Sequence, residues 1–247
     1  MAGYVCTVAG GNGGVGKTTT VVNLAAVLGN SGYEVAVIDA DLGMPNVGEM
    51  LDIDHDRALH DILAGDSTIS ETLVRGTSNV TVVPGEPTLE AYANANPKKL
   101  RKVVNTVKRA YDVVLVDTAA GIREENNTLF ELADGVVLTT TPDNVSLADT
   151  DKTHQLAALV DSEILGTLIV MSTEATELHR IDSEFDFPVL GGIPRDMDAV
   201  GDEPVVQTSP SSPAAQAYQT LAGELERVFF EGADGEALSM AGVDHSE

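Results

Sequence analysis

A glycine-rich segment near the N-terminus has the residue types and spacing that bind phosphate. It reads Gly11-Asn12-Gly13-Gly14-Val15-Gly16-Lys17-Thr18, follows a predicted strand and opens a predicted helix. Glycines allow backbone N–H groups to converge on phosphate oxygens, and the helix N-terminus adds partial positive charge at the same point. We expect Lys17 to contact the outer phosphates and act in catalysis, Thr18 to bind Mg²⁺, and Thr19 to belong to the nucleotide-binding set. The alternative is a glycine-rich turn that binds no ligand.

Three aspartates at the ends of predicted strands are candidates for metal binding and catalysis. Asp117 follows the apolar run of residues 113–116, while Asp39 and Asp41 follow the strand predicted at residues 34–38. Open α/β sheets bind ligands at the carboxyl ends of their strands, and a buried carboxylate needs a cation or hydrogen-bond donors nearby. We therefore expect Asp117 to hold Mg²⁺ through water. The alternative for each aspartate is that it caps the next turn.

These residues require a sheet whose strands end at one edge. The chain alternates short β-branched runs with longer helical patterns, which predicts an α/β fold with a mainly parallel central sheet and helices on both faces, the P-loop NTPase fold. No repeat or interior linker is present, so residues 1–230 are interpreted as one ATPase domain and the acidic residues 231–247 as a disordered tail. Strands are predicted at residues 5–9, 34–38, 80–83, 113–116, 135–139, 167–171 and 189–193, and helices at 18–29, 58–63, 69–74, 97–110, 145–159 and 213–230.

The composition narrows the class of protein. Hydrophobic residues make up 43% of the 247 residues and aromatic residues only 4%, so the core must consist mainly of Val, Leu, Ile and Ala. No apolar run reaches the roughly 18 residues that span a bilayer, and the N-terminus lacks the pattern of a signal peptide. We therefore expect a cytoplasmic protein. The lone Cys6 is expected to be a buried thiol, because one cysteine forms neither an internal disulfide nor an iron–sulfur ligand set.

Acidic residues dominate the charge of the chain. Asp and Glu total 39 against 14 Lys and Arg, a formal net charge of −25 that is spread along the sequence. Such a charge repels itself in dilute buffer, whereas at molar salt the screening length falls to about 3 Å and most of the repulsion disappears. This favours a halophilic protein over an ordinary acidic one. It also argues against nucleic-acid binding, which depends on Lys and Arg at phosphates.

The basic residues are concentrated in the helix predicted at residues 97–110. This segment forms either an ordinary solvated face or a docking surface for an acidic protein partner. It holds six of the 14 basic residues, namely Lys98, Lys99, Arg101, Lys102, Lys108 and Arg109.

Beyond the phosphate loop, several segments resemble the MinD/ParA group of P-loop ATPases, and most closely archaeal MinD-like proteins. Residues 39–47, which begin Asp39-Ala40-Asp41, resemble the first switch of that family, and residues 116–122, which include Asp117, resemble the second. Further similar segments follow at residues 59–65, 82–85, 139–143, 146–149, 192–196 and 212–215. The resemblance covers nearly the whole chain.

The resemblance implies an ATPase that uses ATP and Mg²⁺ and alternates between a monomer and an ATP-dependent homodimer. It implies that Asp41 lies at the metal and orients the attacking water, that Lys17 and Thr18 serve the phosphates and Mg²⁺, and that Asp117 supports the metal. Such enzymes form no covalent intermediate, so catalysis would rest on positioning and charge stabilisation.

Three departures from the family pattern bear on function. Asn12 occupies the position of a signature lysine that, in the family, reaches the partner's nucleotide across the dimer. A neutral amide donates a hydrogen bond but no charge, so we expect slow hydrolysis, a weakened homodimer, or both. Residues 170–172 lack the Asn that often reads adenine, which leaves the backbone near Pro194 and Asp196 to contact the base. The tail is acidic, unlike the basic membrane-binding helix that ends bacterial MinD, so direct membrane binding through it is not expected.

Two functions remain open. The first is an ATPase switch that controls the spatial positioning of a cellular assembly, such as a polar structure or the division apparatus, and changes its affinity for an unidentified protein partner when ATP binds. The second is a nucleotide-binding scaffold with little or no hydrolysis. Asp41 favours the first function and Asn12 favours the second.

The charge leads to a prediction about salt. Removing salt should lower the melting temperature, because the repulsion within a shell of net charge −25 is then unscreened. Thermal unfolding measured in dilute buffer and in molar KCl tests this. An identical melting temperature in the two buffers would contradict the halophilic interpretation.

Overall fold

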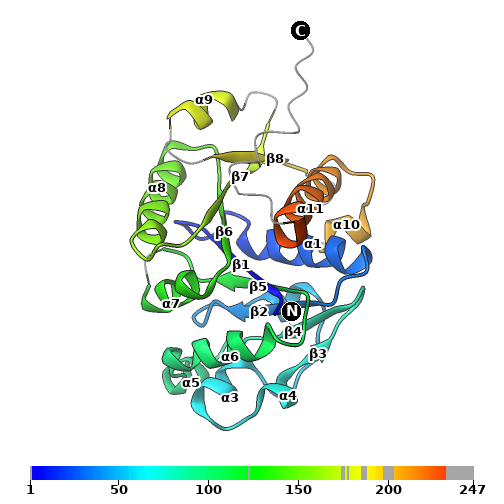
Figure 1. Cartoon of the computed structure of the whole chain (residues 1–247), viewed down its shortest axis with the longest axis vertical. Helices are drawn as coiled ribbons and strands as arrows, with labels where there is room; N and C mark the ends of the chain where they lie inside the picture. The colour runs from blue at the N-terminus through cyan, green and yellow to red at the C-terminus, as the bar shows by residue number, and fades with distance from the viewer. Residues whose placement is uncertain are drawn as a thin grey trace.

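An eight-stranded sheet forms the centre of the computed structural model, which describes residues 2–121, 123–173, 176, 178–184, 188–196 and 203–231. The strand order is β3-β4-β2-β5-β1-β6-β7-β8, and every neighbouring pair is parallel except β3 and β4 (Figure 1). This confirms the predicted mainly parallel α/β architecture. The strands are β1 (Tyr4–Ala9), β2 (Val35–Ala40), β3 (Val74–Arg75), β4 (Val80–Val83), β5 (Val113–Thr118), β6 (Gly135–Thr140), β7 (Ile164–Ser172) and β8 (Val189–Pro194).

The central strands are buried on both faces. Successive side chains of a strand point to opposite faces, so Leu115 of β5 packs into one hydrophobic cluster while Val114 and Val116 pack into another. All six residues of β2, β5 and β6 are buried. This explains why these strands are continuous apolar runs in the sequence.

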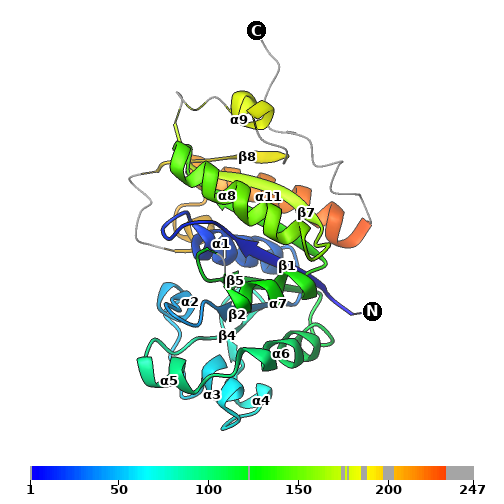
Figure 2. The same ribbon diagram turned by 90° about the vertical axis from the view of Figure 1, so that its left-hand side faces the viewer.

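Helices cover both faces of the sheet (Figures 1 and 2). One face carries α1 (Lys17–Asn30), α10 (Val205–Thr208) and α11 (Pro213–Glu231). The other carries α3 (Leu59–Ala64), α6 (Leu100–Val107), α7 (Glu124–Leu132) and α8 (Asn144–Ala158). The remaining helices are α2 (Val47–Met50), α4 (Ile69–Thr72), α5 (Leu89–Asn94), α9 (Leu178–Glu184) and a 3-10 turn at Pro97–Lys99.

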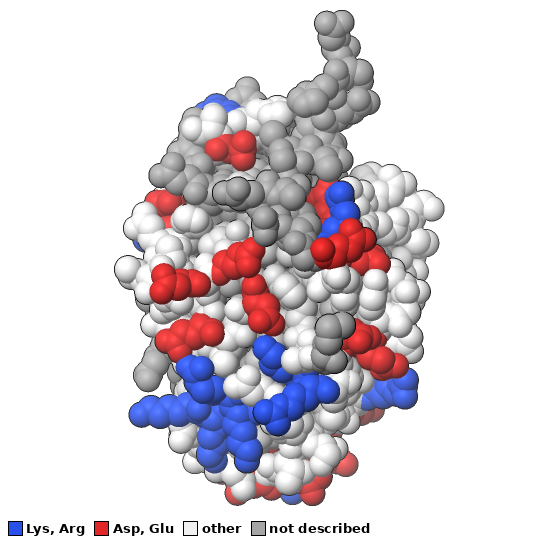
Figure 3. All heavy atoms as spheres, viewed as in Figure 1, with Lys and Arg blue, Asp and Glu red and all other residues white. Residues whose placement is uncertain are grey.

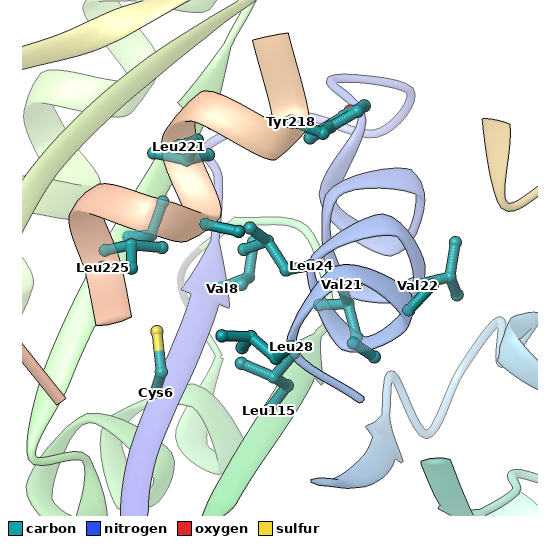
Figure 4. Packing of buried hydrophobic residues seen from close by; sticks show 14 of the residues in the cluster. Cys6, Val8, Val21, Val22, Leu24, Leu28, Leu115, Tyr218, Leu221 and Leu225 are labelled. Atoms are coloured by element: carbon teal, nitrogen blue, oxygen red, sulfur yellow. The ribbon is translucent and has the colours of Figure 1, made fainter. Parts of the chain in front are cut away.

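Aliphatic side chains hold α1 between the sheet and α11. Leu24 and Leu28 of α1 lie against Val8 and Leu115 of the sheet, while Leu225 approaches from α11 (Figure 4). Cys6 belongs to the same cluster and is fully buried, and burial raises the pKa of its thiol to about 12. The expected buried thiol is thus confirmed.

The predicted elements are found with shifted ends, apart from one error. The helix predicted at residues 69–74 stops at Thr72, because Leu73 is extended and Val74 pairs with Val82 as the first residue of β3. The helix predicted at 97–110 ends at Val107, and the carbonyl oxygen of Lys108 accepts a hydrogen bond from the Gly3 N–H group (2.6 Å). The prediction lacked α2, α5, α7, α9 and α10, four of which are short, while α7 has a polar sequence.

The structure also bears on membrane-spanning helices and on the C-terminal tail. None of the helices in the described residues is long and apolar enough to cross a membrane. Helix α11 continues to Glu231, and residues 232–247 of the predicted tail lie outside the described residues.

Two helical glycines provide a matched stability test. A methyl group on Gly29 of α1 would lie 1.8 Å from the carbonyl oxygen of Ser78, whereas one on Gly223 of α11 would meet nothing within 4 Å. Gly29→Ala should therefore lower the free energy of unfolding by about 1 to 3 kcal/mol through overpacking. Gly223→Ala should raise it by about 0.5 to 1 kcal/mol through helix propensity. Denaturant unfolding in molar KCl measures both, and equal effects would contradict the close approach of α1 to Ser78.

Candidate functional site

The phosphate loop connects β1 to α1 and is closely packed on one side. A methyl group on Gly10 would lie 2.7 Å from the carbonyl oxygen of Thr139 in β6, and one on Gly11 would lie 2.4 Å from the backbone carbon of Asp149 in α8. These two glycines therefore seat the loop against β6 and α8. Substitution at either position would displace the loop from its support.

The other side of the loop is open. Gly14 and Gly16 have φ values of 75° and 78°, in the left-handed region that favours glycine. A methyl group on Gly13 or Gly14 would meet nothing within 4 Å. The loop thus presents backbone toward open space at the N-terminus of α1, which is the arrangement that binds phosphate.

Lys17 is the cation of this loop. Its side chain is buried, and its Nζ atom donates a hydrogen bond to the carbonyl oxygen of Asn12 (3.1 Å). Burial lowers the pKa of Lys17, while the carboxylates of Asp117 and Asp41 act in the opposite direction. Lys17 therefore lies near both predicted aspartates and spans the loop that would enclose the phosphates.

Asp39 and Asp117 face each other across neighbouring strands. They are partners in the register of β2 and β5, and both are buried. Burial is the main cause that raises the pKa of each, and for Asp39 the charge of Asp117 adds to it. Asp39 lies inside β2, where it is more deeply buried than its predicted position after the strand implied.

The hydrogen bonds of this pair leave room for a cation. Oδ2 of Asp117 accepts from the Thr18 hydroxyl (2.6 Å), and Oδ2 of Asp39 accepts from the Val47 N–H group (2.9 Å). The Oδ1 atoms of both are buried and have no hydrogen-bond partner among the described residues. Carboxylate and hydroxyl oxygens beside an uncompensated buried charge fit Mg²⁺.

The same residues do not form a dedicated protein cage for a metal. Within the described residues, no group of three or more His, Cys, Asp or Glu side chains could hold a metal ion. Mg²⁺ is usually bound through one or two protein oxygens together with substrate phosphates and water. The pair of Thr18 and Asp117 therefore fits an ion that arrives with a nucleotide.

Asp41 belongs to the first switch, residues 39–47. Its Oδ1 atom accepts a hydrogen bond from the Met44 N–H group (3.0 Å), and its side chain is half-buried. Asp41 therefore lies at the mouth of the site, whereas Asp39 anchors the other end of the switch at Val47. Asp39 and Asp41, which are close in the sequence, therefore occupy different positions in the site.

The described part of the second switch, residues 116–121, contacts the phosphate loop directly. The Gly121 N–H group donates to the carbonyl oxygen of Gly10 (3.2 Å). Asn126 of α7 is buried and donates to the carbonyl oxygens of Ala119 (2.9 Å) and Gly121 (2.7 Å). The sequence reasoning missed Asn126, and Ile122 lies outside the described residues.

His60 contacts the first switch through the backbone of Leu42. The ring is buried, its Nδ1 atom accepts from the Glu86 N–H group (3.0 Å), and its Nε2 atom lies 3.0 Å from the carbonyl oxygen of Leu42. Because Nδ1 accepts, Nε2 carries the proton and donates to Leu42. His60 was assigned no chemistry from the sequence, and its role is to position the backbone of the first switch.

A cavity of about 730 Å³ adjoins the far end of the loop. Its walls include Thr19, Pro194 and Asp196, which the sequence placed in the nucleotide site. Met171, which has a φ of 58° and is 45% exposed, lies at the same cavity. The cavity borders Gly16 at the start of α1, next to the phosphate loop. Lining residues that the sequence reasoning missed are Asn46, Glu49, Met50, Glu203 and Tyr218.

Asn12 is directed toward the N-terminus of α8. Its Nδ2 atom lies 3.5 Å from the Ser146 hydroxyl oxygen, to which it donates. The hydroxyl oxygens of Ser146 and Thr141 lie 2.8 Å apart, and Asp143 caps the helix by accepting from the N–H groups of Val145 and Ser146. Hydrogen bonds from the Thr141 hydroxyl, the Ser146 N–H group and the Ser146 hydroxyl lower the pKa of Asp143 to about 2.

The basic residues of residues 98–109 gather over α6, below a region rich in acidic residues (Figure 3). Two of them pair with residues at and beyond the end of α7: Arg101 with Glu131 (2.5 Å) and Lys108 with Asp134 (3.5 Å). This surface therefore packs beside the helix that follows the second switch.

Comparison with known proteins agrees with this geometry. The family model for ParA, described as an NUBPL iron-transfer P-loop NTPase, matches residues 2–226. An uncharacterized ATP-binding protein of Methanocaldococcus jannaschii is 33% identical over 226 residues, which is 88% of this chain and 86% of that protein.

Two solved structures extend the comparison. The septum site-determining protein MinD of Pyrococcus horikoshii, complexed with Mg-ADP, superposes with a TM-score of 0.87 at 30% identity and covers 93% of this chain and 98% of its own. MinD in the MinC:MinD complex of Aquifex aeolicus superposes with a TM-score of 0.80 at 25% identity and covers 90% and 96%. These similarities support the expected cofactors, ATP and Mg²⁺.

The buried pair of carboxylates predicts that a substitution at Asp117 will stabilise the ligand-free protein and weaken the binding of Mg²⁺. Because burial raises the pKa of Asp117 in the folded state, this carboxyl lowers the free energy of unfolding most above that raised pKa, and the penalty shrinks as the pH falls from there toward the ordinary pKa of aspartate. At pH 8, without nucleotide or Mg²⁺, Asp117→Asn should raise the free energy of unfolding by about 1 to 3 kcal/mol. The stabilisation that Mg-ATP gives the wild type should be lost in this variant.

Thermal unfolding between pH 5 and pH 8 in molar KCl checks both parts. The exposed Asp66→Asn variant removes the same charge and serves as the control, with an unchanged response to Mg-ATP. A variant of Asp117 that is less stable than the wild type without ligands would contradict the unpaired-charge assignment.

Proposed function

Because the chain belongs to the ParA family of P-loop NTPases, we propose that it is a switch that binds ATP, hydrolyses it slowly and controls the spatial positioning of a cellular assembly, a polar structure or the division apparatus. The hydrogen bond between the Gly121 N–H group and the Gly10 carbonyl oxygen carries this proposal. It joins the second switch to the phosphate loop without an intervening residue. A change at the phosphates therefore reaches the switch directly.

The proposed reaction uses the residues of the site in separate roles. Lys17 and the loop backbone hold the outer phosphates, while Thr18 and Asp117 hold Mg²⁺. Bound Mg²⁺ supplies positive charge that offsets the charge developing on the phosphates. Asp41, at the mouth of the site, orients the attacking water.

Asp39 connects the first switch to the metal site. Asp39 holds the Val47 N–H group and lies beside Asp117, so neutralising the charge of Asp117 changes the electrostatic environment of Asp39. The first switch is thereby coupled to metal binding, and the second switch to the phosphates through Gly121. The two segments then present different surfaces to a protein partner in the two nucleotide states.

Asn12 sets the expected strength of the ATP-dependent homodimer. Its amide is neutral and donates to Ser146 of the same chain, so it brings no charge to a second copy. We expect a homodimer weakened by Asn12. The runner-up function, a nucleotide-binding scaffold with little or no hydrolysis, is favoured by this observation.

A protein partner is part of the proposal. The Aquifex aeolicus relative is described in a complex with MinC, which makes a partner plausible for this chain, and the basic surface over α6 is the complementary site for an acidic one. An iron-transfer role, named in the description of the family model, is not proposed because the single cysteine is buried.

Nucleic-acid binding is not proposed because the formal net charge of −25 repels phosphates. Direct membrane binding through the tail is not proposed either, and we place the protein in a salt-rich cytoplasm.

ATP turnover in molar KCl with Mg²⁺ separates the two functions. The wild type should release phosphate slowly, Lys17→Ala should abolish release because it removes the cation of the loop, and Asn12→Lys should accelerate it. Phosphate release measured for the three proteins at equal concentration checks this. A silent wild type together with an active Asn12→Lys variant would replace the ATPase switch with the scaffold.

A further inference from the structure

The phosphate loop supplies less positive charge than phosphoryl transfer usually requires. Residues 10–19 contain one basic residue, Lys17, and Asn12 is neutral. P-loop NTPases commonly complete the charge with an additional cation, provided either by the same chain or by a partner. The described residues around the site include three further cations: Arg195, which lines the cavity beside Pro194, and Arg123 and Lys152 near the phosphate loop.

Arg123 lies between the two switches. It directly precedes α7 and follows the second switch, whose Gly121 N–H group contacts the phosphate loop. Its Nε atom donates to the carbonyl oxygen of Ala120 (3.4 Å), which directs the guanidinium along the second switch.

The guanidinium also reaches the first switch. A methyl group on Gly43 would lie 3.7 Å from Nη1 of Arg123 and 3.7 Å from Oδ1 of Asp41. The guanidinium and the carboxylate of Asp41 therefore lie on the same side of Gly43. Glycine at this position leaves the space between them open.

The charge of Arg123 is available. Its side chain is 44% exposed, and its ion pair with Glu125 is long, at 3.8 Å. Lys152 differs, because its Nζ atom lies 2.7 Å from Oδ1 of Asp149, the residue whose backbone supports Gly11. The positive charge of Lys152 is thus matched locally, whereas the guanidinium of Arg123 can turn toward the phosphates.

We propose that Arg123 is a catalytic residue that supplies, from the same chain, the positive charge that position 12 lacks. This inference rests on the proposed ATPase function. Water attacks the γ-phosphorus of ATP, the bond between that phosphorus and the bridging oxygen breaks, and ADP, phosphate and a proton are released. Arg123 donates hydrogen bonds to the γ-phosphate oxygens, where negative charge accumulates in the transition state.

The test combines turnover with binding of a transition-state mimic in molar KCl. Arg123→Ala should lower kcat about 100-fold, the effect of losing one strong donor to a transition state, with little change in KM. Its affinity for Mg-ADP should equal that of the wild type, while its affinity for Mg-ADP with aluminium fluoride should fall. Arg123→Lys, which keeps the charge, should retain part of the rate.

A double substitution separates catalysis from structural support of α7. Asn12→Lys should accelerate Arg123→Ala more than it accelerates the wild type, because each cation replaces the other. Added guanidinium ion should also restore part of the rate of Arg123→Ala. Lys152→Ala is the matched control, and its turnover should equal that of the wild type.

The outcomes distinguish this inference from the function on which it rests. A wild type that neither turns over ATP nor gains affinity for Mg-ADP with aluminium fluoride contradicts both. A wild type that does either, with Arg123→Ala indistinguishable from it, overturns the role of Arg123 alone. A loss that appears in Lys152→Ala instead would also overturn it.

Discussion

Two carboxylates held side by side in a buried position are the constraint on which this site depends. The parallel register of β2 and β5 makes Asp39 and Asp117 direct neighbours, and burial raises the pKa of both. Such a pair is unfavourable unless donors or a cation compensate it. The Thr18 hydroxyl, the Val47 N–H group and the nearby Lys17 each supply part of that compensation, and a divalent cation would complete it. The position of the phosphate loop and of the first switch therefore follows from one electrostatic requirement.

The surrounding fold makes this requirement tolerable. The strands that carry the two aspartates are buried on both faces by aliphatic side chains from opposite layers of helices. That packing fixes the strand ends without relying on polar contacts within the site. The free energy gained by burying the hydrophobic core offsets the unfavourable burial of the two carboxylates. The polar groups of the site can therefore change their contacts when a ligand binds.

Features encoded locally in the sequence were predictable, and those that depend on distant contacts were not. The glycine pattern of the loop and the apolar runs of the strands are local, so the meeting of Thr18 and Asp117 followed from parallel strands ending at one edge. His60 and Asn126 act on backbone carbonyl groups that the fold brings to them, so their residue types alone gave no signal. The strand β3 has only two residues and exists through its pairing with β4, which explains why a helical pattern was assigned to Val74.

The glycine contacts of the phosphate loop give the site a fixed side and a movable side. Gly10 and Gly11 leave no space against β6 and α8, so the loop cannot shift in that direction. Displacement caused by an incoming nucleotide must be taken up by residues 41–47 and 117–121 on the opposite side. Helix α8 then acts as a stationary frame. A protein that recognised α8 would bind the same surface with or without nucleotide, whereas one that recognised the first switch would sense which nucleotide is bound.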